Sequence, residues 1–155
     1  MNILFVCTGN TCRSPMAAAI MERLCIENAI DANIESAGLF AQDGEPASEE
    51  AVEAVKKYGV DLSHHLSQQI TDELIQKSDL IITMTDAHKM ILQDVAESKT
   101  ATVCELAGID DEIEDPYGGD LEDYIETADT LYIALTQIAD KLEEIQQNQN
   151  EAEDE

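Results

Sequence analysis

Hydrophobic and polar positions along the chain form a pattern typical of strands that alternate with helices. Two continuous apolar runs, at residues 3–6 and 79–85, stop at turn-forming or polar residues. Short runs of this kind are typical of parallel strands that are buried on both faces. Residues 33–38 and 101–106 are predicted as two further strands, which brings the expected sheet to four strands.

Helices are predicted in the intervals between these strands. Ser14 followed by Pro15 is a helix start, with serine at the N-cap and proline at the first helical position. Ser48 can cap a second helix, which Gly59 would stop. The remaining helical patterns cover residues 71–79, 86–97 and 121–145.

Alternating strands and helices predict an α/β domain with a parallel sheet and right-handed crossovers. The chain has 155 residues, which suits one domain. We expect this domain to cover residues 1–147, with a turn-rich loop at residues 109–120, and a disordered acidic tail at residues 148–155. In such sheets ligands bind beyond the carboxyl ends of the strands.

The chain is strongly acidic, with 34 acidic and eight basic side chains and a formal net charge of -26. Such a charge repels nucleic acid and anionic membranes, so we expect neither as a partner, and it favours a monomer at low salt. The acidity has two explanations that the sequence leaves open, solubility alone or a high-salt host in which self-repulsion is screened. No apolar run suits a membrane span and the first residues lack a signal-peptide pattern, so we expect a cytoplasmic protein.

Four cysteines and three histidines indicate neither a disulfide framework nor a metal site. A chain of this size without a secretion signal does not need disulfides. The spacing of the cysteines and histidines lacks a metal-ligand pattern. We therefore expect no structural metal and no cofactor.

The segment CTGNTCRS, residues 7–14, follows the first predicted strand and leads into the first helix. Gly9 lets the backbone turn, so that successive N–H groups can point inward at the helix N-terminus and bind an anion. Arg13 offers a planar fork to two phosphate oxygens. The same dipoles and cation stabilise a thiolate at Cys7, which would then be a nucleophile for a bound phosphoryl group.

Two other interpretations of this segment fit it less well. The ATP-binding pattern GxxxxGK[ST] is absent, so nucleotide binding is not indicated. A buried, inert cysteine in a strand-to-helix turn is the structural alternative. It accounts less well for the C-x5-R-S spacing between a buried strand and a capped helix.

The segment CTGNTCRSPMA closely resembles the N-terminal signature of the low-molecular-weight protein tyrosine phosphatases. The resemblance extends over most of the chain, through ESAG, GVDLSHHLSQQIT and EDPYGG. It implies a flavodoxin-like α/β fold, a four-stranded parallel sheet in the order 2-1-3-4 with helices on both faces. It also implies a metal-independent, two-step protein phosphatase that forms a cysteinyl-phosphate intermediate.

The resemblance implies roles for residues in and around the loop. Cys7 is the nucleophile, Arg13 stabilises the transferring group, and Ser14 donates a hydrogen bond to the Cys7 thiolate. Asn10 would fix the loop shape, supported by Ser36 and by His65, or by the adjacent His64. The residues expected to bind phosphate or substrate are Thr8, Gly9, Asn10, Thr11, Cys12, Ser14 and Tyr117.

Asp115 in the segment DPYGG matches the general acid of the family. Pro116 restricts the backbone of Asp115 to an extended conformation, which can hold the carboxylate over the loop. After the first step the same carboxylate can activate water. The aromatic Tyr117 can flank a substrate side chain.

Thr11 favours one branch of the family. Tyrosine-specific members commonly carry a larger aliphatic residue here, whereas the Gram-positive protein-arginine phosphatases resemble this chain in having TGNTCRSP. The Thr11 hydroxyl can hydrogen-bond a planar guanidinium and Asp115 can meet its charge. We therefore expect phosphorylated proteins as substrates, with phosphoarginine favoured over phosphotyrosine.

Two further functions use the same loop. Arsenate reductases of related sequence need two more cysteines near the third strand, and residues 78–92 contain none. A redox or oxyanion sensor could use a reversible disulfide between Cys7 and Cys12, but this role would not explain Asp115.

Overall fold

The computed structural model describes residues 1–154 and contains one parallel sheet of four strands in the order β2-β1-β3-β4. Its strands are β1 (Asn2–Cys7), β2 (Asn33–Gly38), β3 (Leu80–Thr83) and β4 (Thr100–Thr102). The predicted strand order is confirmed, and the register places Cys7 beside Gly38 and Val6 beside Thr83. The carboxyl ends of β1, β2 and β3 therefore meet at one edge of the sheet.

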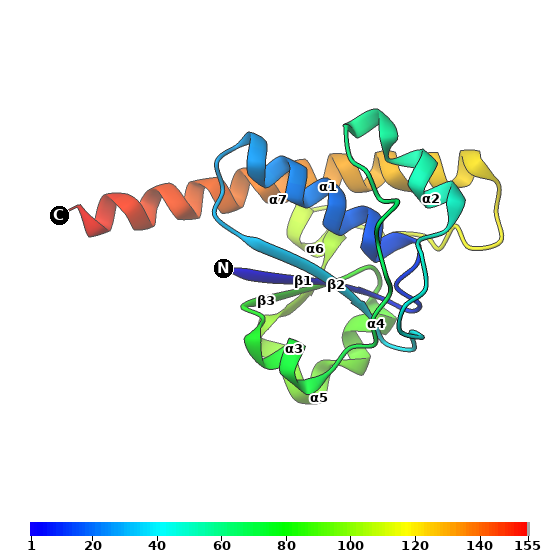
Figure 1. Cartoon of the computed structure of the whole chain (residues 1–155). Coiled ribbons are helices and arrows are strands. Elements are labelled where there is room, and N and C mark those ends of the chain that lie inside the picture. Colours follow the sequence, from blue (N-terminus) through cyan, green and yellow to red (C-terminus); the bar gives the residue numbers. More distant parts are fainter. Residues whose placement is uncertain (155) are drawn as a thin grey trace.

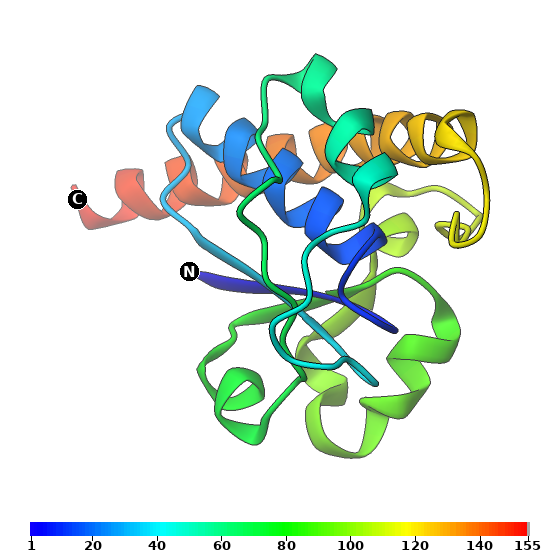
Figure 2. The same ribbon diagram turned by 45° about the vertical axis from the view of Figure 1, so that its right-hand side comes forward.

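Helices cover both faces of the sheet, as expected (Figure 1). Figure 2 shows α1 and the long α7 side by side on one face, and α3, α4 and α5 on the other. The helices are α1 (Arg13–Glu27), α2 (Glu49–Ala54), α3 (Asp72–Lys77), α4 (Asp86–Ile91), α5 (Gln93–Ala96), α6 (Val103–Ala107) and α7 (Leu121–Glu153), with short 3-10 turns η1 (Lys56–Tyr58) and η2 (Glu97–Lys99).

The buried side chains of β1 alternate between two hydrophobic layers, because successive residues of a strand point to opposite faces. Ile3 and Phe5 belong to the larger layer, with side chains of α1 and α7. Leu4 and Val6 belong to the smaller layer, with side chains near α3 and α5. The apolar run that predicted a strand buried on both faces is therefore explained by two packed layers.

Helix α7 packs its apolar stripe on α1 and then continues beyond the sheet (Figure 1). Its buried positions end at Leu142, and Gln146 makes its last contacts with the turn before β2, to the Ala29 carbonyl and the Asp31 N–H. Residues 148–153 are exposed and continue the helix, although we expected disorder there. Their side chains, Gln, Asn, Ala and Glu, allow the helical backbone hydrogen bonds to extend. The domain limit at residue 147 stays a prediction.

Two other expected elements differ from the structure. Strand β4 ends at Thr102, and the following residues form α6 instead of prolonging the strand to residue 106. Thr102 and Glu105 form a capping box that starts this helix. The helix predicted at residues 86–97 is divided at Leu92 into α4 and α5.

Across residues 1–154, no helix combines the length and the apolar character that a membrane span requires.

Candidate active site

The loop between β1 and α1 is held against β2 by backbone contacts. The N–H groups of Leu39 and Phe40 donate to the carbonyls of Cys7 and Thr8, each at 2.9 Å. A Cβ atom on Gly38 would lie 2.7 Å from the Thr8 carbonyl oxygen, so this close approach requires glycine. We had assigned the need for glycine to Gly9, but a Cβ there would meet no atom nearer than 3.8 Å.

Asn10 makes several hydrogen bonds within and around the loop. Its backbone lies in the left-handed region, with φ 58°, which asparagine tolerates better than most residues. Its fully buried amide donates to Ser14 Oγ at 2.9 Å and to Ser36 Oγ at 3.0 Å, and accepts from the Gln68 N–H at 3.0 Å. Ser36 therefore contacts the loop through Asn10.

Ser14 lies between Asn10 and Cys7 and is not the N-cap that we predicted. Helix α1 begins at Arg13 with Cys12 at the N-cap position. Ser14 Oγ lies 2.9 Å from Cys7 Sγ and 2.9 Å from the Asn10 amide nitrogen. Because this nitrogen is a donor only, the serine oxygen accepts from it, which leaves the serine proton free to be donated to the sulfur. We call this directed chain of hydrogen bonds, from Asn10 through Ser14 to Cys7, the serine relay.

His65, rather than His64, supports the loop. Its Nε2 lies 2.7 Å from the Asn10 carbonyl oxygen, so Nε2 carries the proton and donates. Burial lowers the pKa of His65, although this hydrogen bond opposes the shift. The side chain of His64 is 91% exposed and lies 3.9 Å from Asp61, away from the loop.

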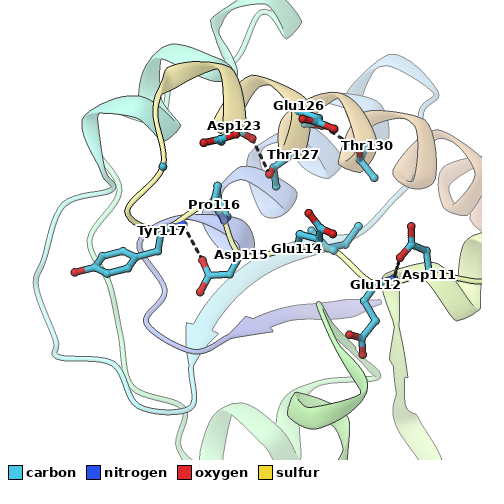
Figure 3. Close-up of a pocket in the computed structure, with 12 residues that line it drawn as sticks. Asp111, Glu112, Glu114, Asp115, Pro116, Tyr117, Asp123, Glu126, Thr127 and Thr130 are labelled. Atoms are coloured by element: carbon cyan, nitrogen blue, oxygen red, sulfur yellow. Dashed lines mark hydrogen bonds between the residues drawn. The ribbon is translucent and has the colours of Figure 1, made fainter.

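Arg13 and Asp115 meet across the loop. The buried guanidinium donates from Nη1 to the Ile113 carbonyl at 3.0 Å, and Nη2 lies 3.5 Å from Asp115 Oδ2. The other carboxylate oxygen of Asp115 accepts from the Tyr117 N–H at 3.0 Å (Figure 3). The segment before α7 thus orients both the cation and the carboxylate.

These side chains surround a cavity of about 220 Å³, which we call the loop cavity. The exposed ring of Tyr117 lies at its edge. Its lining consists of residues 7–13 together with Asp115 and Tyr117. Every residue that we expected to bind phosphate or substrate lines this cavity, except Ser14, which lies beneath it.

A second cavity of about 290 Å³ adjoins the first between the loop before α7 and α7 itself (Figure 3). It shares Asp115 and Tyr117 with the loop cavity. Its acidic lining residues are Asp111, Glu112, Glu114, Asp115, Asp123 and Glu126.

Cys12 and Thr11 differ in how they are held. Buried Cys12 Sγ lies 3.4 Å from the hydroxyl of Tyr124 and 3.6 Å from Ser48 Oγ. Burial, followed by the contact with Cys12, raises the pKa of Tyr124 to about 12. Within residues 1–154, the one hydrogen-bond partner of the Thr11 hydroxyl is Cys12 Sγ, at 3.8 Å.

Sequence reasoning missed Tyr124 and His88. Tyr124 lies in the first turn of α7, 112 residues from its partner Cys12. His88 Nε2 lies 2.9 Å from the hydroxyl of Thr8. The one available signal for His88 was its position just after β3, because the carboxyl end of β3 adjoins that of β1.

No group of three or more His, Cys, Asp or Glu side chains in the described part of the chain could hold a metal ion. The four cysteines are free and buried. The reactive groups that line the loop cavity are two cysteines, Cys7 and Cys12, together with Arg13 and the Asp115 carboxylate.

A C-x5-R loop at the carboxyl edge of a parallel sheet, with a carboxylate across the cavity, is typical of cysteine-dependent protein phosphatases. The family model described as low molecular weight phosphotyrosine protein phosphatase matches residues 2–150. The chain belongs to this family and is a low molecular weight protein phosphatase.

Individual relatives fall into two groups by name. The protein-arginine-phosphatase of Bacillus subtilis (strain 168) is 38% identical over 92% of this chain and 97% of its own length. The low molecular weight protein-tyrosine-phosphatase PtpB of Staphylococcus epidermidis is 37% identical over 92% of this chain and 100% of its own. A solved structure of the arginine phosphatase YwlE, a mutant with a phosphorylated active-site serine in place of cysteine, has a TM-score of 0.88 at 38% identity, covering 92% of this chain and 95% of that chain.

Proposed function

We propose that this phosphatase hydrolyses phosphoarginine in proteins through a covalent phosphate on Cys7. The serine relay carries this proposal, because Ser14, whose oxygen accepts from Asn10, can donate its own proton to a thiolate at Cys7. Arg13 and Asp115 lie on the same cavity and supply the other two groups that phosphoryl transfer needs.

In the first step the Cys7 thiolate attacks phosphorus, the S–P bond forms and the P–N bond to the substrate breaks. The backbone N–H groups of the loop and Arg13 bind the phosphate oxygens, so that the phosphate takes the place of Asp115 at the guanidinium. Asp115 acts here in its protonated form: it donates the carboxyl proton to the departing guanidine nitrogen and is left as a carboxylate.

In the second step a water molecule attacks the phosphorus of the cysteinyl phosphate. The Asp115 carboxylate accepts a proton from this water, the S–P bond breaks, and phosphate and the Cys7 thiolate are released. The phosphorylated serine in the related structure supports a phosphate on this position of the loop.

Thr11 supports phosphoarginine as the substrate. It lines the cavity and its hydroxyl makes no hydrogen bond to an oxygen or nitrogen atom of residues 1–154, so the hydroxyl is free for a substrate group. A guanidinium presents N–H donors in a plane, which a hydroxyl and a carboxylate can both accept. The name of the Bacillus subtilis relative favours the same substrate.

Phosphotyrosine is the second candidate. The ring of Tyr117 is 80% exposed at the edge of the cavity and could stack on an aromatic substrate. The relative from Staphylococcus epidermidis is named as a tyrosine phosphatase.

The two substrates are separated by comparing phosphoarginine and phosphotyrosine peptides of the same sequence. The wild-type protein should prefer phosphoarginine, and Thr11→Ile should lower the ratio of the two kcat/KM values at least tenfold. A hydrogen bond to a charged group is worth about 1.5–3 kcal/mol, and the added bulk offers an apolar wall to an aromatic ring. Thr136→Ile, on α7 away from the cavity, is the matched control. An unchanged ratio in Thr11→Ile would contradict the role of Thr11.

We further propose that the protein acts as a monomer in the cytoplasm and binds neither nucleic acid nor membranes. Its net charge of -26 opposes self-association and anionic partners, and its free cysteines suit a reducing compartment. Sedimentation at low and high salt would test the monomer.

A further inference from the structure

His88 is a buried titratable residue that the proposed reaction does not use. It lies in the first turn of α4, where its N–H donates to the side chain of Thr85 at the N-cap. Strand β3 is the neighbour of β1, so this turn adjoins the loop after β1. The His88 side chain reaches that loop and contacts Thr8, whose residue lines the loop cavity.

The two ring nitrogens of His88 have different surroundings. Nε2 lies 2.9 Å from Thr8 Oγ1. Nδ1 is buried and has no hydrogen-bond partner within residues 1–154. Burial lowers the pKa of His88, the charge of Arg13 adds to this effect, and Asp115 and Glu112 oppose it. The ring is therefore neutral near pH 7 and carries a single proton.

The position of that proton follows from the cost of burying an unpaired group. A proton on Nδ1 would leave a buried N–H donor without an acceptor, which is rarer in proteins than an acceptor without a donor. With the proton on Nε2, the ring donates to Thr8 Oγ1. The threonine oxygen is then occupied as an acceptor, and its own proton is free to turn into the cavity.

We propose that Thr8 is an oxyanion donor of the loop and that His88 is the residue that positions its proton. The hydrogen bonds run from His88 through Thr8 to a phosphate oxygen, and we call them the threonine relay. They match the serine relay, in which Asn10 directs the Ser14 proton to Cys7. One relay serves the nucleophile and the other serves the group that it attacks. The proposal rests on the proposed phosphatase function of the loop.

The first test uses the unmodified protein and needs no turnover. Ring nitrogen NMR should show His88 as the tautomer protonated on Nε2, and inorganic phosphate should shift its resonances. The resonances of exposed His64 are the internal control and should not move. A proton on Nδ1, or no response of His88 to phosphate, would overturn the proposal. A protein that binds phosphate in this way but hydrolyses no phosphopeptide would instead contradict the proposed function.

The second test is a double-mutant cycle on kcat/KM and on inhibition by inorganic phosphate. Thr8→Val should weaken phosphate binding about tenfold or more, because it removes a hydrogen bond to a charged group. His88→Leu should also weaken phosphate binding, because the proton of Thr8 is then no longer held toward the phosphate. The double variant should lose no more than Thr8→Val alone. His88→Gln should restore most of the loss, because its amide can donate from the position of Nε2.

Losses that add in the double variant would show that His88 acts through packing and would overturn the proposal. The same conclusion would follow if His88→Gln behaved like His88→Leu. If His88→Leu does not fold, the NMR experiment on the wild-type protein and on Thr8→Val still decides, because removal of the Thr8 hydroxyl should abolish the response of His88 to phosphate.

Discussion

Replacing the hydrogen-bond donor of Asn10, which serves both Ser14 and Ser36, by an acceptor should disable Cys7 while the backbone contacts that hold the loop remain. Asn10→Asp keeps the size of the side chain, its tolerance for φ 58° and the oxygen that accepts from the Gln68 N–H. It replaces the donor to Ser14 Oγ with an acceptor. The Ser14 proton would then turn toward the new carboxylate and away from Cys7 Sγ.

The magnitude follows from two terms. Loss of a hydrogen bond to a thiolate costs about 1.5–3 kcal/mol. The two contacts of 2.9 Å in the serine relay place the new carboxylate within about 6 Å of the sulfur. At that separation and an effective dielectric constant of about 20, repulsion between the charges adds up to about 3 kcal/mol. If the new carboxyl group is protonated, the repulsion is absent, so we expect kcat/KM to fall by about 10- to 10⁴-fold.

The assay is turnover of an aryl phosphate together with the rate of alkylation of Cys7 by iodoacetamide. Asn10→Asp should lower both rates, whereas Ser14→Ala should lower them by the first term alone. Asn33→Asp adds the same charge at the exposed opposite end of β2 and should change neither rate. If iodoacetamide alkylated Cys7 of the Asn10→Asp variant at the wild-type rate, the serine relay would be refuted.

Three more predictions test the reaction and its pH limits. Cys7→Ser should abolish turnover but keep phosphate binding, because Arg13 and the loop amides remain. Calorimetry with phosphate measures the binding, and its loss would show that Cys7 also shapes the loop. Asp115→Asn should slow hydrolysis by about 10² to 10⁴-fold, and less for substrates with good leaving groups, which need no proton; an equal loss for all leaving groups would indicate a structural role. Burial lowers the pKa values of His65 and His88 in the folded protein. Below about pH 6.5 the unfolded chain therefore binds more protons than the folded chain, and these two residues lower the free energy of unfolding as the pH falls. Urea unfolding at pH 7 and pH 5 should therefore show a smaller loss of stability for His88→Gln than for the wild-type protein, and equal losses would contradict a neutral, buried His88.

Strands β1, β2 and β3 were each predicted near their place in the structure, and β2 has the predicted bounds, Asn33–Gly38. The apolar runs of β1 and β3 must be covered on both faces, which leaves few alternatives to a central parallel strand. The segment after Thr102 was misassigned because Val103 and Cys104 suit a buried strand as well as a buried helix. The Thr102 and Glu105 pair of a capping box was the local signal that separates the two.

The contacts of the site were harder to predict than its residues. Ser14 before a proline is an ordinary N-cap pattern, and its contact with Cys7 was expected only from the family resemblance; the fold adds that the Asn10 amide donates to the serine oxygen. The requirement for glycine lies at Gly38, because β2 approaches the loop there, and no local pattern near Gly9 could indicate this. Such contacts depend on strands that are neighbours in the sheet but distant in the chain.

The basic residues show how a chain of net charge -26 can hold an anion site. Arg13 is the one Lys or Arg side chain among residues 1–154 that lines the loop cavity. The other seven contact carboxylates or backbone carbonyls elsewhere: Arg23, Lys56, Lys57, Lys77, Lys89, Lys99 and Lys141.

The net charge and the loop therefore act over different distances. Repulsion from surface carboxylates extends over a Debye length, about 10 Å at 0.1 M salt and about 3 Å at 1 M. The hydrogen bonds of the serine relay are 2.9 Å long and buried, so salt screens them little. Salt should therefore change how fast a phosphorylated substrate reaches the cavity more than how Cys7 attacks it. The chemistry of the loop is the same whether the acidity serves solubility alone or a high-salt host.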